Sequence, residues 1–127
     1  MIQVGSMLNV IDNSGARKVQ CLKVIGGNKR RYAYIGDTIL ISVKKLRAKR
    51  RVFSRVRKGE MHRAIVVRTK AKSLNRNSDN FWSLQNSAIL ISKQDKLIGT
   101  RIFGPLPRKF RSSNLMRYIT LSAGLIS

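Results

Sequence analysis

Several short stretches of the chain alternate between apolar and polar residues, which is the pattern of β-strands with one buried face. The pattern predicts strands at 7–11, 16–25, 38–43, 64–67, 87–91 and 98–103. Three of these stretches are followed directly by aspartate or glycine, at Asp12, Gly26 and Gly104, and these residues tolerate turn conformations. The clearest turn is Asp12-Asn13-Ser14-Gly15. The distribution of apolar residues therefore predicts a mainly β protein.

The stretch 16–25 shows the expected alternation most fully. Val19, Cys21 and Lys23 fall on one side of the predicted strand, because successive side chains of a strand point to opposite faces. Cys21 is accordingly interpreted as a small strand residue. This strand ends at Gly26 and Gly27, where glycine allows a turn.

The segments between these strands are less regular. Residues 44–58 form a basic arm, which Arg57-Lys58-Gly59-Glu60 closes as a turn back to the domain. Residues 73–87 are rich in serine and asparagine and predict a long exposed hairpin connection. In it, Phe81 and Trp82 either pin the connection to the domain or stack on a partner.

The C-terminal part is expected to combine a helical part at 106–117 with a closing strand at 118–121. Ser112 or Ser113 can cap one short helix that runs to about Arg117. No segment repeats another and no linker composition occurs, so residues 1–127 are expected to form a single domain. A small closed barrel leaves no long strand edge open and is the favoured architecture.

Charge defines the class of partner. The 127 residues carry 27 Lys and Arg against 5 Asp and Glu, a net charge of +22, while a hydrophobic content of 43% is that of a folded domain. Residues 44–72 hold thirteen of these cations against Glu60 alone. A dense run of one sign destabilises the folded state unless an anionic partner neutralises it.

Nucleic acid fits this charge better than a membrane surface does. A membrane-surface segment would be a basic helix with a bulky apolar face, whereas 44–51 is almost solidly basic. The longest apolar runs have four residues, far short of the roughly 20 that span a bilayer. We expect a soluble protein, and the N-terminus shows no export or import signal.

The sequence offers no components for catalysis or metal binding. Its single cysteine, Cys21, cannot form an intrachain disulfide, and its single histidine, His62, lacks companions for a zinc site or a catalytic triad. The five acidic residues form no pair at useful spacing. We therefore expect no cofactor, no metal and no enzymatic activity.

The mode of binding is expected to rest on shape and charge. The chain has few aromatic residues and no signature of a base-stacking sheet, so sequence-specific reading of single strands is not expected. The strand-like pattern also disfavours recognition-helix readers of DNA. A β domain that grips a folded, phosphate-rich surface remains.

Particular strings of residues resemble the universal large-subunit ribosomal protein fourteen family, in its bacterial and organellar form. They occur in the family's order and near its spacing over nearly the whole chain. The strings begin at Met7-Leu8-Asn9-Val10 and Asp12-Asn13-Ser14-Gly15-Ala16-Arg17, continue through Gly36-Asp37, Val56-Arg57-Lys58-Gly59-Glu60 and Ala64-Ile65-Val66-Val67-Arg68-Thr69-Lys70, and end with Ile98-Gly99-Thr100-Arg101-Ile102-Phe103-Gly104-Pro105.

The resemblance implies a five-stranded β-barrel with a protruding β-ribbon and short C-terminal helical turns, bound to large-subunit ribosomal RNA (rRNA). It also implies neighbours: large-subunit proteins three and nineteen, small-subunit rRNA at an intersubunit bridge, and the ribosome-silencing factor. Matched by motif, Thr100, Arg101 and Arg117 would lie on the bridge and docking face. The basic composition, rich in serine, asparagine and isoleucine, favours a mitochondrial origin, with a bacterial or plastid origin as alternatives.

The candidate rRNA contacts are the cations of the arm together with residues that flank the turns and strand ends. They are Asn13, Ser14, Arg17, Lys18, Lys29, Arg30, Arg31, Tyr32, Lys44, Lys45, Arg47, Lys49, Arg50, Arg51, Arg55, Arg57, Lys58, Arg68, Lys70 and Lys72. Arginine can bridge two phosphate oxygens, while lysine acts as a movable point charge.

Three further functions stay open at this point. The chain could serve chiefly as a docking module for a ribosome-silencing or assembly factor, with the RNA contacts as an anchor. It could be an architectural nucleic-acid binder outside the ribosome. A hydrolase on a barrel scaffold is the enzyme alternative, and the residues give it the least support.

Overall fold

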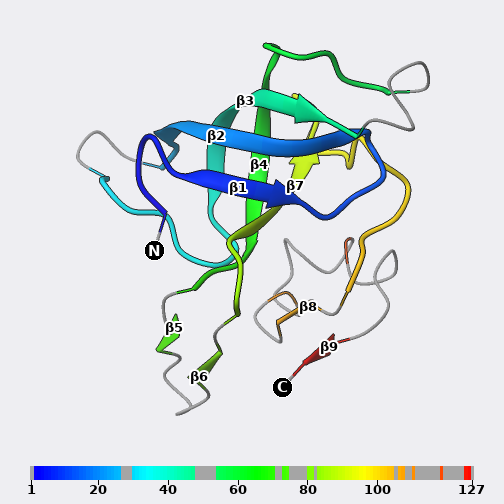
Figure 1. Ribbon diagram of the computed structural model, residues 1–127. Helices are drawn as coiled ribbons and strands as arrows, with labels where there is room; N and C mark the ends of the chain where they lie inside the picture. Colours follow the sequence, from blue (N-terminus) through cyan, green and yellow to red (C-terminus); the bar gives the residue numbers. More distant parts are fainter. Residues whose placement is uncertain are drawn as a thin grey trace.

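The chain folds into a closed five-stranded barrel (Figure 1). The computed structural model describes residues 2–26, 30–47, 54–70, 73–74, 80–81, 83–104, 106–107, 110, 118 and 125–126. In their order around the barrel, the strands are β1 (Met7–Val10), β2 (Ala16–Val24), β3 (Thr38–Leu46), β4 (Met61–Arg68) and β7 (Ser87–Ile91). β1 and β7 run parallel, and the other neighbouring strands run antiparallel. The predicted mainly β barrel is confirmed.

Strand β2 departs from simple alternation because its pairing with β3 is irregular. The register shifts between Ala16 and Val19 and again between Cys21 and Lys23. An extra residue in one strand reverses the facing of every residue after it. As a result Val19, Cys21 and Val24 are buried while Lys23 is exposed. The prediction that Lys23 shares a side with Cys21 was wrong for this reason.

Residues 64–67 of β4 and all of β7 are buried on both faces, which explains their continuous apolar runs. One face contributes to the interior of the barrel, where Ala64 and Leu90 pack among the other strands. The opposite face packs against the C-terminal part of the chain in a second hydrophobic cluster. Its members are Ile11, Ile35, Ile65, Val67, Ile89, Ile91, Ile102, Leu106, Phe110 and Tyr118. The C-terminal part therefore covers one wall of the barrel.

The turn after β1 contains an acidic residue, Asp12, which is fully buried. Its Oδ1 accepts from the backbone N–H and the hydroxyl of Ser14, at 3.0 and 2.5 Å, and its Oδ2 accepts from the N–H of Leu90 at 2.9 Å. The bond to Leu90 extends the contact between β1 and β7 beyond their ladder, whose last pair is Val10 and Ala88. Burial raises the pKa of Asp12, although these hydrogen bonds and the charge of Arg47 act in the opposite direction.

The same turn holds both ends of the basic arm. The N–H of Arg47 donates to the carbonyl of Gly15 at 2.9 Å, and the N–H of Arg55 donates to the carbonyl of Ser14 at 3.0 Å. A Cβ on Gly15 would meet Ser54, with 2.4 Å to its Oγ and 3.0 Å to its Cα. We name residues 12–15 the closure turn, because it joins β1, β7 and the two ends of the arm.

Several predicted boundaries were wrong. β3 runs through Leu46, so Lys44 and Lys45 belong to the barrel and not to the arm. Residues 98–103 form no strand, because Ile102 makes an isolated bridge to Asp12 and Thr100 donates its N–H to a side chain. At 44–46 a strand carries a basic sequence that looks like a loop, whereas at 98–103 an irregular backbone carries a strand-like sequence pattern.

The C-terminal part also differs from its prediction. The predicted helical part at 106–117 was wrong at its start, because Leu106–Pro107 is strand β8, paired in parallel with β9 (Leu125–Ile126). Phe110 lies in a 3₁₀ turn and Tyr118 is helical. Residues 111–117 and 119–121 lie outside the described residues. The predicted closing strand at 118–121 was therefore wrong at Tyr118. For its other three residues the strand stays a prediction.

A small ribbon projects from one end of the barrel (Figure 1). It consists of β5 (Ser73–Leu74) and β6 (Asn80–Phe81), which pair antiparallel. This pairing fits the predicted hairpin connection at 73–87. Trp82 lies outside the described residues, so the two alternatives for Phe81 and Trp82 stay predictions. In the part of the chain that the structure describes, no helix is long and apolar enough to cross a membrane.

Asp12→Asn should lower the free energy of unfolding by about 1–3 kcal/mol, because an amide accepts through one atom and leaves a buried donor unpaired. Urea unfolding at neutral pH measures this loss. Asp95→Asn is the matched control, since Asp95 is exposed with a φ of 60°, which asparagine adopts readily. The control should change stability by less than about 0.5 kcal/mol. Equal stability of Asp12→Asn and the wild type would contradict the role of Asp12.

The pH dependence of this difference has a defined sign. Because folding raises the pKa of Asp12 above 3.8, the folded protein holds that proton more tightly than the unfolded chain does. The stability of the wild type therefore falls as pH rises from about 3.8 through the raised pKa. The Asp12→Asn variant does not titrate there, so the advantage of the wild type should narrow over this interval. An advantage that widens with pH would be inconsistent with the raised pKa.

Gly15→Ala tests the closure turn against Gly59→Ala. Both glycines have a positive φ, 104° and 88°, but a Cβ at Gly59 meets nothing within 4 Å. Each variant should lose about 1–2 kcal/mol from backbone strain, and Gly15→Ala should lose about 1–3 kcal/mol more from its collision with Ser54. Thermal or urea unfolding of the pair gives the difference. Equal losses would show that Ser54 moves away freely.

Candidate nucleic-acid interface

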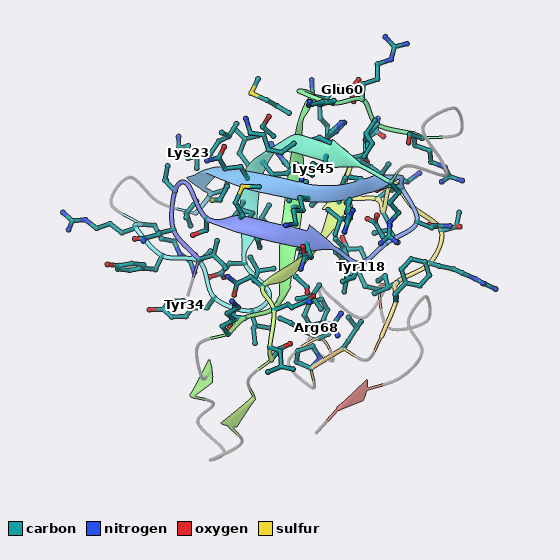
Figure 2. All side chains as sticks on the ribbon, viewed as in Figure 1. Lys23, Tyr34, Lys45, Glu60, Arg68 and Tyr118 are labelled. Carbon is teal, nitrogen blue, oxygen red and sulfur yellow. The ribbon has the colours of Figure 1, made fainter. Side chains whose placement is uncertain are left out.

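The outer face of β2 and β3 places two lysines directly opposite each other. Lys18 pairs with Lys45 in the register of the two strands. Lys45 is exposed, as are its neighbours Arg17 and Lys44, and Lys18 is half-buried. Figure 2 labels Lys45 on β3, whereas Lys23 lies toward the other end of the β2–β3 pair, opposite Leu40. We name Arg17, Lys18, Lys44 and Lys45 the lysine face.

Like charges directly opposite on a sheet destabilise it by roughly 0.2–1 kcal/mol. Among the described residues, the ion pairs are Arg30 with Asp37 and His62 with Glu60, and neither involves the lysine face. The barrel therefore presents this positive charge without an acidic neighbour in an ion pair.

In the turn at 57–60, the carboxylate of Glu60 bonds to residues close to it in the sequence. Glu60 accepts from the N–H of Arg57 at 3.1 Å and pairs with His62 at 2.8 Å. The His62 hydrogen bond, followed by the Arg57 N–H, lowers the pKa of Glu60. Glu60 thereby shapes the turn, which the sequence predicted correctly, while Arg57 and Lys58 remain exposed.

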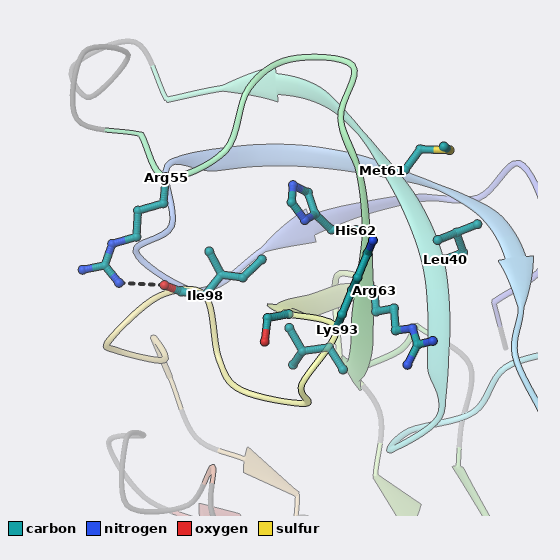
Figure 3. A pocket seen from close by; sticks show the side chains of 9 residues that line it. Leu40, Arg55, Met61, His62, Arg63, Lys93 and Ile98 are labelled. Atoms are coloured by element: carbon teal, nitrogen blue, oxygen red, sulfur yellow. Dashed lines mark hydrogen bonds between the residues drawn. The ribbon is translucent and has the colours of Figure 1, made fainter.

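Two arginines of the arm act as anchors at its ends. Arg47 donates from Nη2 to the carbonyl of Val10 at 3.1 Å and lies over the ring of Phe103, 5.6 Å from its centroid. Arg55 donates from Nη1 to the carbonyl of Ile98 at 2.6 Å (Figure 3). Their side chains thus fix the ends of the arm on the barrel.

Arg68, at the end of β4 (Figure 2), is a third arginine whose guanidinium bonds to a backbone carbonyl. It is half-buried, and desolvation lowers the pKa of its guanidinium. Its Nη2 donates to the carbonyl of Phe103 at 3.4 Å. The Nε atoms of Arg47 and Arg68 are both buried and have no hydrogen-bond partner among the described residues. Both arginines therefore pack against the Phe103 segment.

Asn13 and Ser14, which the sequence suggested as RNA contacts, are engaged inside the fold. Ser14 is fully buried with its hydroxyl on Asp12. The Oδ1 of Asn13 accepts from the N–H groups of Thr100 and Arg101 at 2.6 and 3.1 Å, and its Nδ2 donates to the Thr100 hydroxyl at 2.7 Å. Asn13 thus holds the 99–101 loop, and the side chain of Arg101 is left exposed.

A second exposed cationic segment lies between β2 and β3. Arg30, Arg31 and Tyr32 are exposed there, as predicted for surface contacts. Tyr34 is also exposed, and the sequence interpretation passed over it. The signal was present, because Tyr32 and Tyr34 alternate with the small or apolar residues Ala33 and Ile35.

A recess of about 620 Å³ opens beside β4 (Figure 3). Its apolar lining comes from Leu40, Met61, Ile91 and Ile98. Figure 3 shows Arg55 on one side of His62, and Arg63 and Lys93 on the other. The predicted contacts did not include Arg63 and Lys93. Across the described ranges, no three metal-ligating side chains come together.

The remaining candidates divide into two groups. Lys70 is exposed, and its N–H donates to the side-chain oxygen of Asn86 at 2.9 Å. The others lie outside the described residues: Lys29, Lys49, Arg50, Arg51, Lys72 and Arg117. Of the bridge residues, Thr100 and Arg101 therefore have a described position.

Comparison with known protein families gives one match. The model of the family described as Ribosomal protein L14p/L23e matches residues 1–126. This family consists of structural proteins of the large ribosomal subunit and is not an enzyme family. The match confirms the family resemblance and agrees with the basic barrel described above. The chain belongs to the L14p/L23e family of ribosomal proteins and is a structural constituent of the large ribosomal subunit.

Proposed function

We propose that the chain binds large-subunit rRNA through the lysine face, the 30–32 segment and the arm. The observation that carries this proposal is the cross-strand pair of Lys18 and Lys45. Two cations held opposite each other on paired strands raise the energy of the free barrel. A phosphate placed between them would convert this repulsion into attraction and release condensed counterions from the RNA.

The barrel would supply a rigid frame for these contacts. Both ends of the arm bond to the closure turn through Arg47 and Arg55, so the arm leaves the barrel and returns to it at fixed points. Fixed backbone lowers the conformational entropy lost when the side chains meet phosphates. In this proposal Arg47, Arg55 and Arg68 chiefly position the interface.

The proposed contacting set consists of cations and Tyr32, and it includes residues outside the described part of the chain. Its described members are Arg17, Lys18, Arg30, Arg31, Tyr32, Lys44, Lys45, Arg57, Lys58 and Lys70. Lys29, Lys49, Arg50, Arg51 and Lys72 complete it from the sequence alone. We leave Asn13 and Ser14 out, because their side chains serve the closure turn and the 99–101 loop.

A second proposed surface is the 99–101 loop with Arg117, which would meet small-subunit rRNA at a bridge or dock the ribosome-silencing factor. Support comes from the loop itself, because Asn13 fixes its backbone while Thr100 and Arg101 stay exposed. Large-subunit proteins three and nineteen are the proposed protein neighbours. The composition supports a mitochondrial ribosome over a bacterial or plastid one, and the genomic location of the coding sequence tests this.

Lys45→Glu should have opposite effects on stability and on binding. The variant replaces a like-charged pair by an ion pair with Lys18, so the free energy of unfolding should rise by roughly 0.2–1 kcal/mol. Affinity for large-subunit rRNA should fall, and the slope of log K against log salt should become shallower by about 0.7–0.9 for each phosphate that is no longer neutralised. Urea unfolding and filter binding over a salt series measure the two effects.

Lys96→Glu is the matched control for this experiment. It makes the same change in net charge at an exposed turn outside the lysine face. It should weaken RNA binding less than Lys45→Glu does and should leave stability nearly unchanged. Equal losses of affinity in the two variants would mean that net charge alone decides binding, and the lysine face would lose its assigned role.

Arg101→Glu tests the second surface separately. Its backbone contact with Asn13 does not depend on the side chain, so folding and incorporation into large subunits should persist. Subunit joining, or binding of the silencing factor to purified large subunits, should fall several-fold. Sucrose-gradient sedimentation and factor co-pelleting give the two readouts. Failure of the variant to enter large subunits would instead place Arg101 in the rRNA interface.

A further inference from the structure

The segment before β3 presents two tyrosines to solvent. Tyr32 and Tyr34 are 43% and 47% exposed, whereas Ala33 and Ile35 between and after them are buried. This alternation is that of an extended chain lying on the barrel, with its odd and even residues on opposite faces. In Figure 2 the ring of Tyr34 projects away from the barrel.

The backbone that carries these rings is held on both sides. Ala33 exchanges two hydrogen bonds with Ile2, at 2.9 and 2.7 Å. The N–H of Tyr34 donates to Asp37 Oδ2 at 2.7 Å, and the N–H of Asp37 donates back to the carbonyl of Tyr34 at 3.0 Å. Gly36 donates to the carbonyl of Val66 at 2.7 Å. The backbone beneath the two rings is therefore fixed before any partner binds.

The charges around the rings are positive. Arg30 and Arg31 precede Tyr32 and are exposed. The nearby acid of this segment, Asp37, pairs with Arg30 and accepts from Tyr34. The surface thus combines two exposed aromatic rings on a fixed backbone with the cations Arg30 and Arg31, of which Arg30 also pairs with Asp37.

We propose that Tyr32 and Tyr34 form a stacking surface for unpaired nucleotides of large-subunit rRNA, with Arg30 and Arg31 on the adjoining phosphates. Unpaired bases stack on aromatic side chains in a way that tolerates any base, since every base has a π-face. Duplex RNA buries its base faces and would leave the two rings unused. This inference rests on the proposed rRNA binding and adds to it a contact with bases that the lysine face does not make.

The arginines favour RNA over a protein partner as the occupant. An apolar protein surface would cover the tyrosines, but it would place the charged side chains of Arg30 and Arg31 next to apolar groups and offer them no anion. A nucleotide satisfies both components, because its base covers a ring while its phosphate reaches a guanidinium. A protein partner is an outcome of the test below.

The test compares aromatic and non-aromatic replacements in the full chain. Tyr34→Ala and Tyr32→Ala should each weaken binding to single-stranded oligonucleotides and to large-subunit rRNA by about 5- to 150-fold at every salt concentration. The slope of log K against log salt should stay unchanged, because the variants keep every cation that meets a phosphate. Tyr34→Phe should bind like the wild type, and Tyr34→Leu, which keeps apolar bulk, should bind like Tyr34→Ala.

Two further variants serve as controls. Met61→Ala removes another exposed apolar side chain, 66% exposed on β4, and should leave binding unchanged. Arg31→Ala should lower the salt slope by about 0.7–0.9, in contrast to the tyrosine variants. Circular dichroism checks that each variant is folded. Ultraviolet crosslinking of the wild type in large subunits should join Tyr32 or Tyr34 to unpaired nucleotides.

The outcomes separate this inference from the proposal on which it rests. Wild-type affinity in the doubly substituted alanine variant, or crosslinks from both tyrosines to a protein only, would overturn the stacking surface and leave the lysine face intact. A wild-type chain that binds no rRNA at low ionic strength would overturn the proposed function itself. Loss of affinity in Tyr34→Ala with full retention in Tyr34→Leu would show an apolar contact and would also reject stacking.

Discussion

The buried carboxylate of Asp12 is the interaction on which the rest of the structure depends. β1 and β7 close the barrel in parallel over a short ladder, and the carboxylate extends this contact by accepting the N–H of Leu90. The neighbouring residues Ser14 and Gly15 then receive the N–H groups at the two ends of the arm. Barrel closure and the placement of the arm therefore use one turn, and a change there affects both. This shared origin explains why Asp12, although fully buried, governs where the arm leaves the barrel and returns to it.

The two hydrophobic clusters allow the barrel to carry its uncompensated charge. Residues 64–67 of β4 and all of β7 are buried on both faces, so a small domain gains a second apolar contact with its C-terminal part. This burial offsets repulsion such as that between Lys18 and Lys45 on β2 and β3. A closed barrel also keeps the two lysines from moving apart, because every strand is paired on both edges. The fold thus maintains a charge arrangement that a flexible chain would relax.

The local pattern of apolar and polar residues was enough to predict where most barrel strands lie. It was not enough to predict which way a side chain faces where the pairing of two strands is irregular. The interior positions of β4 and β7 follow from their apolar runs. The bulge in β2 does not, because an inserted residue depends on the pairing with β3, and it exchanged the facing of Lys23 and Val24. Lys44 and Lys45 looked like the start of the arm, yet the outer face of a barrel accepts lysine as readily as a loop does. The family strings identified the partner class, and Tyr34 went unnoticed because, unlike Tyr32, it does not directly follow the basic residues 29–31.

Counting cations in the sequence does not show which of them the fold itself already engages. Arg47, Arg55 and Arg68 have the composition of an RNA-binding surface, but their guanidiniums bond to carbonyls of the barrel. Sequence cannot separate these anchors from Lys45, since the difference lies in which carbonyls the fold brings within reach. An arginine has five donors, so an anchor can hold a carbonyl with one group and offer another to a phosphate. Anchoring and binding are therefore coupled at the ends of the arm, and the barrel sets the direction in which its remaining positive charge points.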